Sequence, residues 1–318
     1  MNASSILFFA WFVITLLASS LASGATPNLR KVNTNGTELA YVQAGTGTPV
    51  VFVHGELADQ SFWDSQRDVI ASQYSFVSYS LRYHHPNAWP DGGAQYTYAT
   101  HIADLAALIR TISSSPVHLV GHGMGANIAL RLALAHPELL KTLTLAEPSP
   151  LDLATESKEG RAGLAEFKKR LAPVSNALAA GRPEQARQLF SAALSGGRAA
   201  VPPALDSMAR DNERTLALLI AMAPPEPKVD CGSLGSLRVP TQMLTGTWTF
   251  DLARATSDRL ADCIAGSEHV LVPGGHLMNL REPRAFNQAL LVFLRQHEKP
   301  LYRSAIGVTD TQLTGLAN

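Results

Sequence analysis

A run of glycines between an apolar segment and a helical segment constrains this 318-residue chain more than any other feature. Residues 117–120 are typical of a buried strand, and residues 126–135 have the apolar spacing of a helix. Between them stand Gly121, Gly123 and Gly125. Glycine permits sharp turns and close backbone packing, so the chain must pass abruptly from strand to helix here. Taken alone, such a turn is also compatible with phosphate binding at the helix N-terminus.

Short apolar segments alternate with helical segments through most of the chain. Strands are predicted at residues 38–43, 49–53, 76–81, 117–120, 139–145, 241–245 and 268–272. Helices are predicted at residues 101–112, 126–135, 252–264 and 285–296. This alternation predicts an α/β fold with a mostly parallel sheet flanked by helices on both faces.

The alternation is interrupted between residues 151 and 228. This segment is rich in Ala, Leu, Arg and Glu, is punctuated by Gly and Pro, and shows helical patterns without a strand. A helical insertion between two strands of the sheet is the natural interpretation. The predicted organisation is a signal peptide at 1–25, core segments at 26–150 and 229–298, a helical insertion at 151–228 and a tail at 299–318.

The first residues have the pattern of a targeting segment. Residues 6–18 are an almost unbroken apolar run, and mostly small residues follow as far as Ala25. The run is too short to span a bilayer and has the length of a signal-peptide core, although residues 1–5 contain no Lys or Arg. We expect a secreted or periplasmic protein without a stable membrane span after cleavage, or a membrane anchor if the segment is not cleaved.

Composition narrows the function classes. Hydrophobic residues make up 46% and charged residues 16%, and 26 Lys and Arg balance 26 Asp and Glu. These values argue for a large core and against a nucleic-acid partner. No phosphate loop, dinucleotide fingerprint or metal-spaced cysteine cluster occurs, so we expect no cofactor and no metal. The two cysteines, Cys231 and Cys263, either pair after export or are buried separately as thiols.

Three motifs together resemble the α/β-hydrolase superfamily over about residues 36–297. The glycine-rich turn resembles the nucleophile elbow, Gly-x-Ser-x-Gly. Residues 50–55 resemble the strand before the oxyanion loop, and residues 273–283 resemble the C-terminal histidine loop. The resemblance implies that the insertion is a cap, which roofs a pocket for a small or medium apolar molecule.

The resemblance assigns roles to some residues and leaves others open. His276 matches the general base, and the main-chain N–H groups of Met124 and of Glu56 or Leu57 match the oxyanion donors. Gly123 stands at the nucleophile position and has no side-chain atom that could attack a carbonyl.

The acid that would orient His276 is ambiguous. The usual family position, three residues after Gly246, is held by Thr249, which carries no charge. Asp251 follows two residues later. Glu147 ends the preceding strand, where some dehalogenases of the superfamily place their acid, and we favour it over Asp251. In a third possibility neither carboxylate lies near His276.

Several functions are compatible with a glycine at the nucleophile position. We expect either a hydrolase of the ester or lactone type, or another enzyme that depends on the His276 base, acting on a small apolar substrate without a serine nucleophile. Water could then occupy the space of the missing side chain. The alternative is a non-catalytic binding protein or a pseudoenzyme of the same fold.

Overall fold

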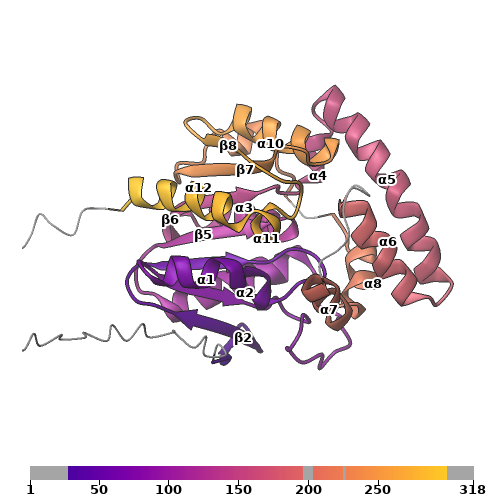
Figure 1. Cartoon of the computed structure of the whole chain (residues 1–318), viewed down its shortest axis with the longest axis horizontal. Helices are drawn as coiled ribbons and strands as arrows, with labels where there is room; N and C mark the ends of the chain where they lie inside the picture. The colour runs from indigo at the N-terminus through magenta and orange to yellow at the C-terminus, as the bar shows by residue number, and fades with distance from the viewer. Residues whose placement is uncertain (1–27, 196–202, 225–226, 299–318) are drawn as a thin grey trace, which may run out of the picture.

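A computed structural model describes residues 28–195, 203–224 and 227–298 of the chain. The predicted signal segment, residues 1–25, and the predicted tail, residues 299–318, lie outside the described residues. Figure 1 shows a central sheet with helices on its faces and a group of helices beyond one end of the strands.

The predicted mostly parallel sheet is confirmed, with eight strands in the order β1-β2-β4-β3-β5-β6-β7-β8. The first two strands pair as an antiparallel hairpin, β2 is antiparallel to β4, and the remaining neighbours are parallel. The strands are β1 (Arg30–Thr34), β2 (Thr37–Ala44), β3 (Pro49–Val53), β4 (Ser75–Tyr79), β5 (Val117–His122), β6 (Leu140–Ala146), β7 (Thr241–Gly246) and β8 (Glu268–Val272).

Alternating side chains of the strands form two cores, one on each face of the sheet, as the period of two in a strand requires. Val51 and Val53 of β3 face one core, and Val50 and Phe52 face the other. The helices of the first core are α2 (Tyr98–Ile112), α3 (Met124–Ala135) and α10 (Asp251–Cys263). Those of the second are η1 (Gln60–Trp63), α1 (Asp64–Ala71), α11 (Met278–Arg281) and α12 (Pro283–Gln296). A further short 3-10 helix, η2 (Pro137–Leu139), joins α3 to β6.

The predicted insertion is helical wherever it is described. Its elements are α4 (Leu151–Ala154), α5 (Lys158–Ala179), α6 (Pro183–Ser195), α7 (Pro203–Asp211) and α8 (Arg214–Ala221). Leu57, which follows β3, packs in one cluster with buried cap residues such as Val174, Phe190 and Leu216. The cap therefore covers the carboxyl ends of the strands, where ligands bind in open α/β sheets.

The chain returns from the cap to the sheet through α9 (Cys231–Leu234), and a disulfide holds this return. Cys231 is bonded to Cys263, the last residue of α10, with 5.0 Å between their Cα atoms. The sequence left open whether the two cysteines pair or are buried separately as thiols, and in the structure they are paired. Glu156 approaches these sulfur atoms, but their valence is taken up by the disulfide, so the group is a poor metal site.

Removing this disulfide is expected to destabilise the fold. The bond closes a loop with a sequence separation of 32 residues, and such cross-links stabilise by about 2–4 kcal/mol. The double variant Cys231→Ser, Cys263→Ser should therefore melt at a lower temperature than the wild type. A thiol reductant should lower the melting temperature of the wild type alone. Identical melting curves for both proteins, with and without reductant, would contradict the pairing.

Candidate active site

The turn around Gly123 joins the end of β5 to the start of α3. Gly123 has φ 54° and ψ −119°, a backbone region that favours glycine. Its N–H donates to the carbonyl of Ala146, and its own carbonyl accepts from the N–H of Asn127. A Cβ on Gly121 would lie 2.6 Å from the Cα of Ala126, and one on Gly125 would collide with the carbonyl oxygen of His54. The outer glycines thus let helix and strands pack in contact, while position 123 projects over the sheet edge.

His276 lies in the loop after β8 and is buried. Its Nδ1 donates to Oε2 of Glu147 over 2.7 Å. The carbonyl oxygen of His276 accepts a hydrogen bond of 2.8 Å from Nε2 of His122. The edge of the imidazole meets the ring of Phe250 at a centroid distance of 5.3 Å. These contacts fix the ring from several sides and leave its Nε2 directed at the Gly123 position.

Glu147 directly follows β6 and is fully buried, with a backbone φ of 44° that is rare outside glycine. Oε1 accepts from the N–H of Gly246 at 2.8 Å. Oε2 accepts from the hydroxyl of Thr249 at 2.6 Å, in addition to the imidazole of His276. The polar partners satisfy a carboxylate that would otherwise be costly to bury. Such a network holds the acid in one orientation.

The structure separates the two carboxylates that the sequence left as alternatives. Asp251 is exposed as the first residue of α10, whereas Glu147 is the acid in contact with His276. Thr249 occupies the usual family position of the acid and donates to the relocated carboxylate. No part in the site was predicted for Thr249, because it carries no charge. Its short polar side chain at that position was the available signal.

Two neighbouring histidines differ in charge for clear physical reasons. Burial by itself lowers the pKa of His276, but the hydrogen bond and charge of Glu147, with the charge of Glu56, outweigh it and leave the pKa raised. Burial, reinforced by the charge of His276, lowers the pKa of His122 to about 3. His122 is therefore a neutral packing residue, and the contact with Glu147 favours the protonated form of His276.

The side chain of Glu56 enters the space that a residue at position 123 would fill. A Cβ built on Gly123 would lie 2.7 Å from Oε2 of Glu56 and 3.7 Å from Nε2 of His276. The missing side chain was expected to leave room for a water molecule, and Glu56 was assigned a role only through its main-chain N–H. In the structure the half-buried side chain of Glu56 also borders this space.

The main-chain N–H groups expected as oxyanion donors stay a prediction. Met124 is the first residue of α3, so its N–H has no acceptor within the helix. Leu57 has a positive φ of 52° and is anchored under the cap. A Cβ on Gly55 would be only 3.0 Å from Nδ1 of His122, so the loop after β3 lies against the elbow. This contact between loop and elbow is compatible with oxyanion donors from both.

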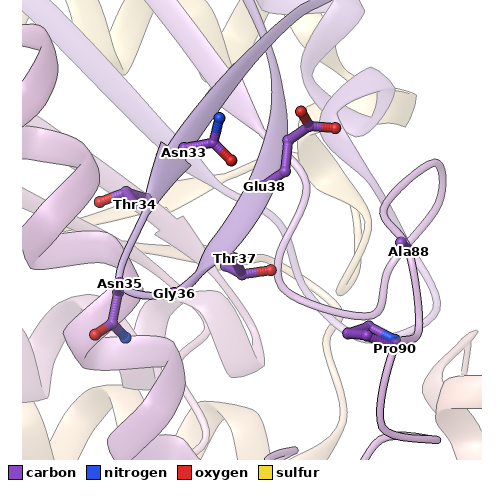
Figure 2. A pocket seen from close by; sticks show the side chains of 8 residues that line it. All are labelled: Asn33, Thr34, Asn35, Gly36, Thr37, Glu38, Ala88 and Pro90. Atoms are coloured by element: carbon purple, nitrogen blue, oxygen red, sulfur yellow. The ribbon is translucent and has the colours of Figure 1, made fainter.

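An aromatic contact joins the cap to this site. Phe167 of α5 stacks on Phe250, with ring centroids 5.4 Å apart and planes at 9°. The other side of Phe250 meets His276. A surface hollow of about 430 Å³ lies elsewhere, between the β1–β2 hairpin and residues 88–90, and Figure 2 shows its lining side chains. None of the residues that surround Gly123 and His276 lines that hollow.

Comparison with known proteins shows the family of the chain. Residues 50–289, more than half of the chain, match the model of the alpha/beta hydrolase family. The chain therefore belongs to the alpha/beta hydrolase family.

Its relatives include hydrolases of several kinds. A Klebsiella pneumoniae relative, provisionally named a carbamate hydrolase, is 28% identical over 249 residues, which cover 77% of this chain and 90% of the relative. A fluoroacetate dehalogenase of a Burkholderia species is 27% identical over 124 residues, which cover 38% of this chain and only 41% of the dehalogenase. A thermophilic esterase from Thermogutta terrifontis is similar in fold, with a TM-score of 0.68, 23% identity, and coverage of 85% of this chain and 99% of the esterase.

Within the described ranges, none of the helices has both the length and the apolar character needed to cross a bilayer.

Replacing Glu147 by Gln is expected to lower the pKa of His276. The variant removes the charge that opposes burial, and a lost carboxylate partner changes a pKa by about 1–3 pH units. Titration of the histidine ring resonances by NMR measures the change, with Asp251→Asn as the matched control. A shift in Asp251→Asn and none in Glu147→Gln would make Asp251 the partner.

The raised pKa of His276 also predicts how stability depends on pH. A folded-state pKa above the unfolded value means that the folded state binds the proton more tightly. The stabilisation by the Glu147–His276 pair is then fully present below the unfolded pKa of about 6.5 and is lost as pH rises through the folded pKa. Chemical denaturation at several pH values should show this loss in the wild type and a weaker dependence in Glu147→Gln.

Proposed function

We propose that this protein is a hydrolase of small carboxylic esters or lactones in which water, and not a side chain at position 123, attacks the carbonyl. The observation that carries the proposal is the buried His276–Glu147 pair, whose Nε2 lies 3.7 Å from the place of a Cβ at Gly123. Hydrolysis by water requires a group that transfers protons beside the place of attack, and His276 lies beside the Gly123 position. The N–H groups of Met124 and Leu57 would hold the oxyanion.

The surroundings of the pair suggest the kind of substrate. Phe167 and Phe250 bring an aromatic surface to His276, and a helical cap covers the carboxyl ends of the strands. A site that is covered by a cap and bordered by aromatic rings favours a small or medium apolar molecule. In serine hydrolases that lack members of the triad, the oxyanion hole and substrate binding alone still accelerate acyl transfer by roughly 10³–10⁴-fold over water. An acceleration of this size is sufficient for a substrate with a reactive carbonyl.

A binding protein or pseudoenzyme is the second candidate. The observation in its favour is the carboxylate of Glu56, which fills the space where a nucleophile would act. Export belongs to the proposal as well. The apolar run at residues 6–18 supports it, and so does the disulfide between Cys231 and Cys263, a bond typical of oxidising compartments.

The first test of this proposal is turnover and its dependence on His276. Purified protein is screened against p-nitrophenyl esters and aliphatic lactones, with lactone opening followed by acid release at constant pH. His276→Gln should lower kcat for a lactone by about 10²–10⁴-fold, the usual contribution of a proton-transfer group. The half-buried His136, at the far end of α3, provides the control His136→Gln, which should keep wild-type activity. Absence of turnover in the wild type, with a ligand-dependent rise in melting temperature, would favour the binding protein.

The second test introduces the family nucleophile. Gly123→Ser should lower the melting temperature, because a non-glycine residue in strained backbone costs about 1–3 kcal/mol. Its Cβ would also stand 2.7 Å from the Glu56 carboxylate, so this variant alone should gain little esterase activity. Adding Glu56→Ala clears the space, and the double variant should give a burst of p-nitrophenol and react with serine-directed phosphonates. Wild type and Glu56→Ala are the controls and should show no burst. A folded double variant without a burst would show that His276 and the oxyanion donors no longer form a working acyl-transfer site.

A further inference from the structure

The carboxylate of Glu56 is an acidic group inside the site that the family motifs do not explain. It follows the loop glycine, Gly55, and its Oε2 stands 2.7 Å from the place of a Cβ at Gly123. The same place is 3.7 Å from Nε2 of His276. Oε2 of Glu56 and Nε2 of His276 therefore border the same place, while Glu147 holds the imidazole through Nδ1.

The charge of Glu56 acts on three buried groups around it. Burial raises the pKa of Tyr96 well above its ordinary value, and the charge of Glu56 raises it further. Burial and then the charge of Glu56 raise the pKa of Tyr98 to about 12. The charge of Glu56 also adds to that of Glu147 in raising the pKa of His276. A side chain directed into bulk water would be screened from these groups.

We propose that Glu56 is a catalytic residue, the general base that accepts a proton from the attacking water while His276 donates a proton to the leaving group. The inference rests on the proposed hydrolase function and assigns its two proton transfers. A water molecule beside Oε2 of Glu56 would stand where the hydroxyl of the family's serine stands. It would be able to attack a carbonyl held by the N–H groups of Met124 and Leu57.

The proposed steps balance. Water forms the new C–O bond and transfers one proton to Glu56, and the carbonyl π electrons move to the oxygen in the oxyanion site. When the carbonyl re-forms, the ester C–O bond breaks and its electron pair leaves with the alkoxide, which takes the Nε2 proton of His276. The proton on Glu56 then returns to Nε2 of His276. The net change is addition of one water to the ester, which gives a carboxylic acid and an alcohol.

Direct attack by Glu56 on the substrate is chemically less suitable than action on water. It would form a mixed anhydride, and the tetrahedral adduct would expel the carboxylate more readily than an alkoxide, because the carboxylate is the weaker base. The environments also favour the proposed division of roles. His276 lies near two carboxylates, which favours its charged form, and a charged imidazole is an acid. Pairs of groups whose environments differ in this way are typical acid and base partners.

The test compares Glu56→Gln with Glu138→Gln, whose side chain is exposed on the 3-10 helix after α3. Glu56→Gln should lower kcat by about 10²–10⁴-fold with KM and melting temperature little changed, and Glu138→Gln should match the wild type. Formate, a small carboxylate, should restore part of the activity of Glu56→Ala, which a merely structural role of Glu56 would not allow.

Two substrates with different leaving groups distinguish the general base from the general acid. p-Nitrophenolate leaves without a proton, whereas an alkoxide needs one. Glu56→Gln should therefore impair p-nitrophenyl acetate and an aliphatic lactone alike, and His276→Gln should impair the lactone far more. In a single turnover in water labelled with a heavy oxygen isotope, the peptide that contains Glu56 should gain no label. Label in that peptide would make Glu56 a covalent nucleophile and overturn the proposal.

The outcomes separate this inference from the proposed function. If turnover requires His276 but Glu56→Gln keeps the wild-type rate, Glu56 is not the base and the hydrolase function stands. If the wild type turns over no ester or lactone, the hydrolase function fails and the role of Glu56 fails with it.

Discussion

The hydrogen bond between His276 and Glu147 joins two parts of the chain that are 129 residues apart. Both partners are buried, so their charges must be satisfied by protein groups. Glu147 achieves this by accepting from Gly246 and Thr249 at the end of β7, while His122 fixes the carbonyl of His276 from β5. The ends of β5, β6 and β7 must therefore stay in register for the pair to exist. The positive φ of Glu147 is compatible with this need, because strained backbone persists where its surroundings determine it.

The parallel sheet could be predicted because its strands are short apolar segments separated by helical ones, and because glycines mark the tightest turn. The resemblance to the superfamily pointed to Glu147 or Asp251 as the acid partner of His276 and left open that neither lies near it. Side-chain direction separates the two: Glu147 points inward from a strand end, and Asp251 begins an amphipathic helix with its side chain in solvent. A helix N-terminus is a favourable place for an exposed carboxylate, and this explains Asp251 without any role in the site.

The roles of Thr249 and of the Glu56 side chain could not be predicted, for a common reason. Motif spacing locates a residue on an element but does not show which neighbours its side chain meets. Thr249 contacts a residue 102 positions away, and Glu56 enters space bounded by Gly123 and His276. The motif directed attention to the main chain at position 56, because oxyanion donors are backbone groups. The charge of the residue beside these donors was the available signal for a role of its side chain.

Gly123 and Glu56 are best understood as one arrangement. A serine at position 123 and the present orientation of Glu56 exclude one another, since the Cβ would come within 2.7 Å of the carboxylate oxygen. Glycine removes that conflict and also relieves the turn, because its φ of 54° carries little penalty without a side chain. With glycine alone, the site would have His276, its acid and the oxyanion donors around an empty space. With Glu56 beside that space, its charge adds to that of Glu147 in raising the pKa of His276, which favours the charged imidazole. An acid–base pair acting on water needs both groups beside the place of attack, and Oε2 of Glu56 and Nε2 of His276 both border the Gly123 position.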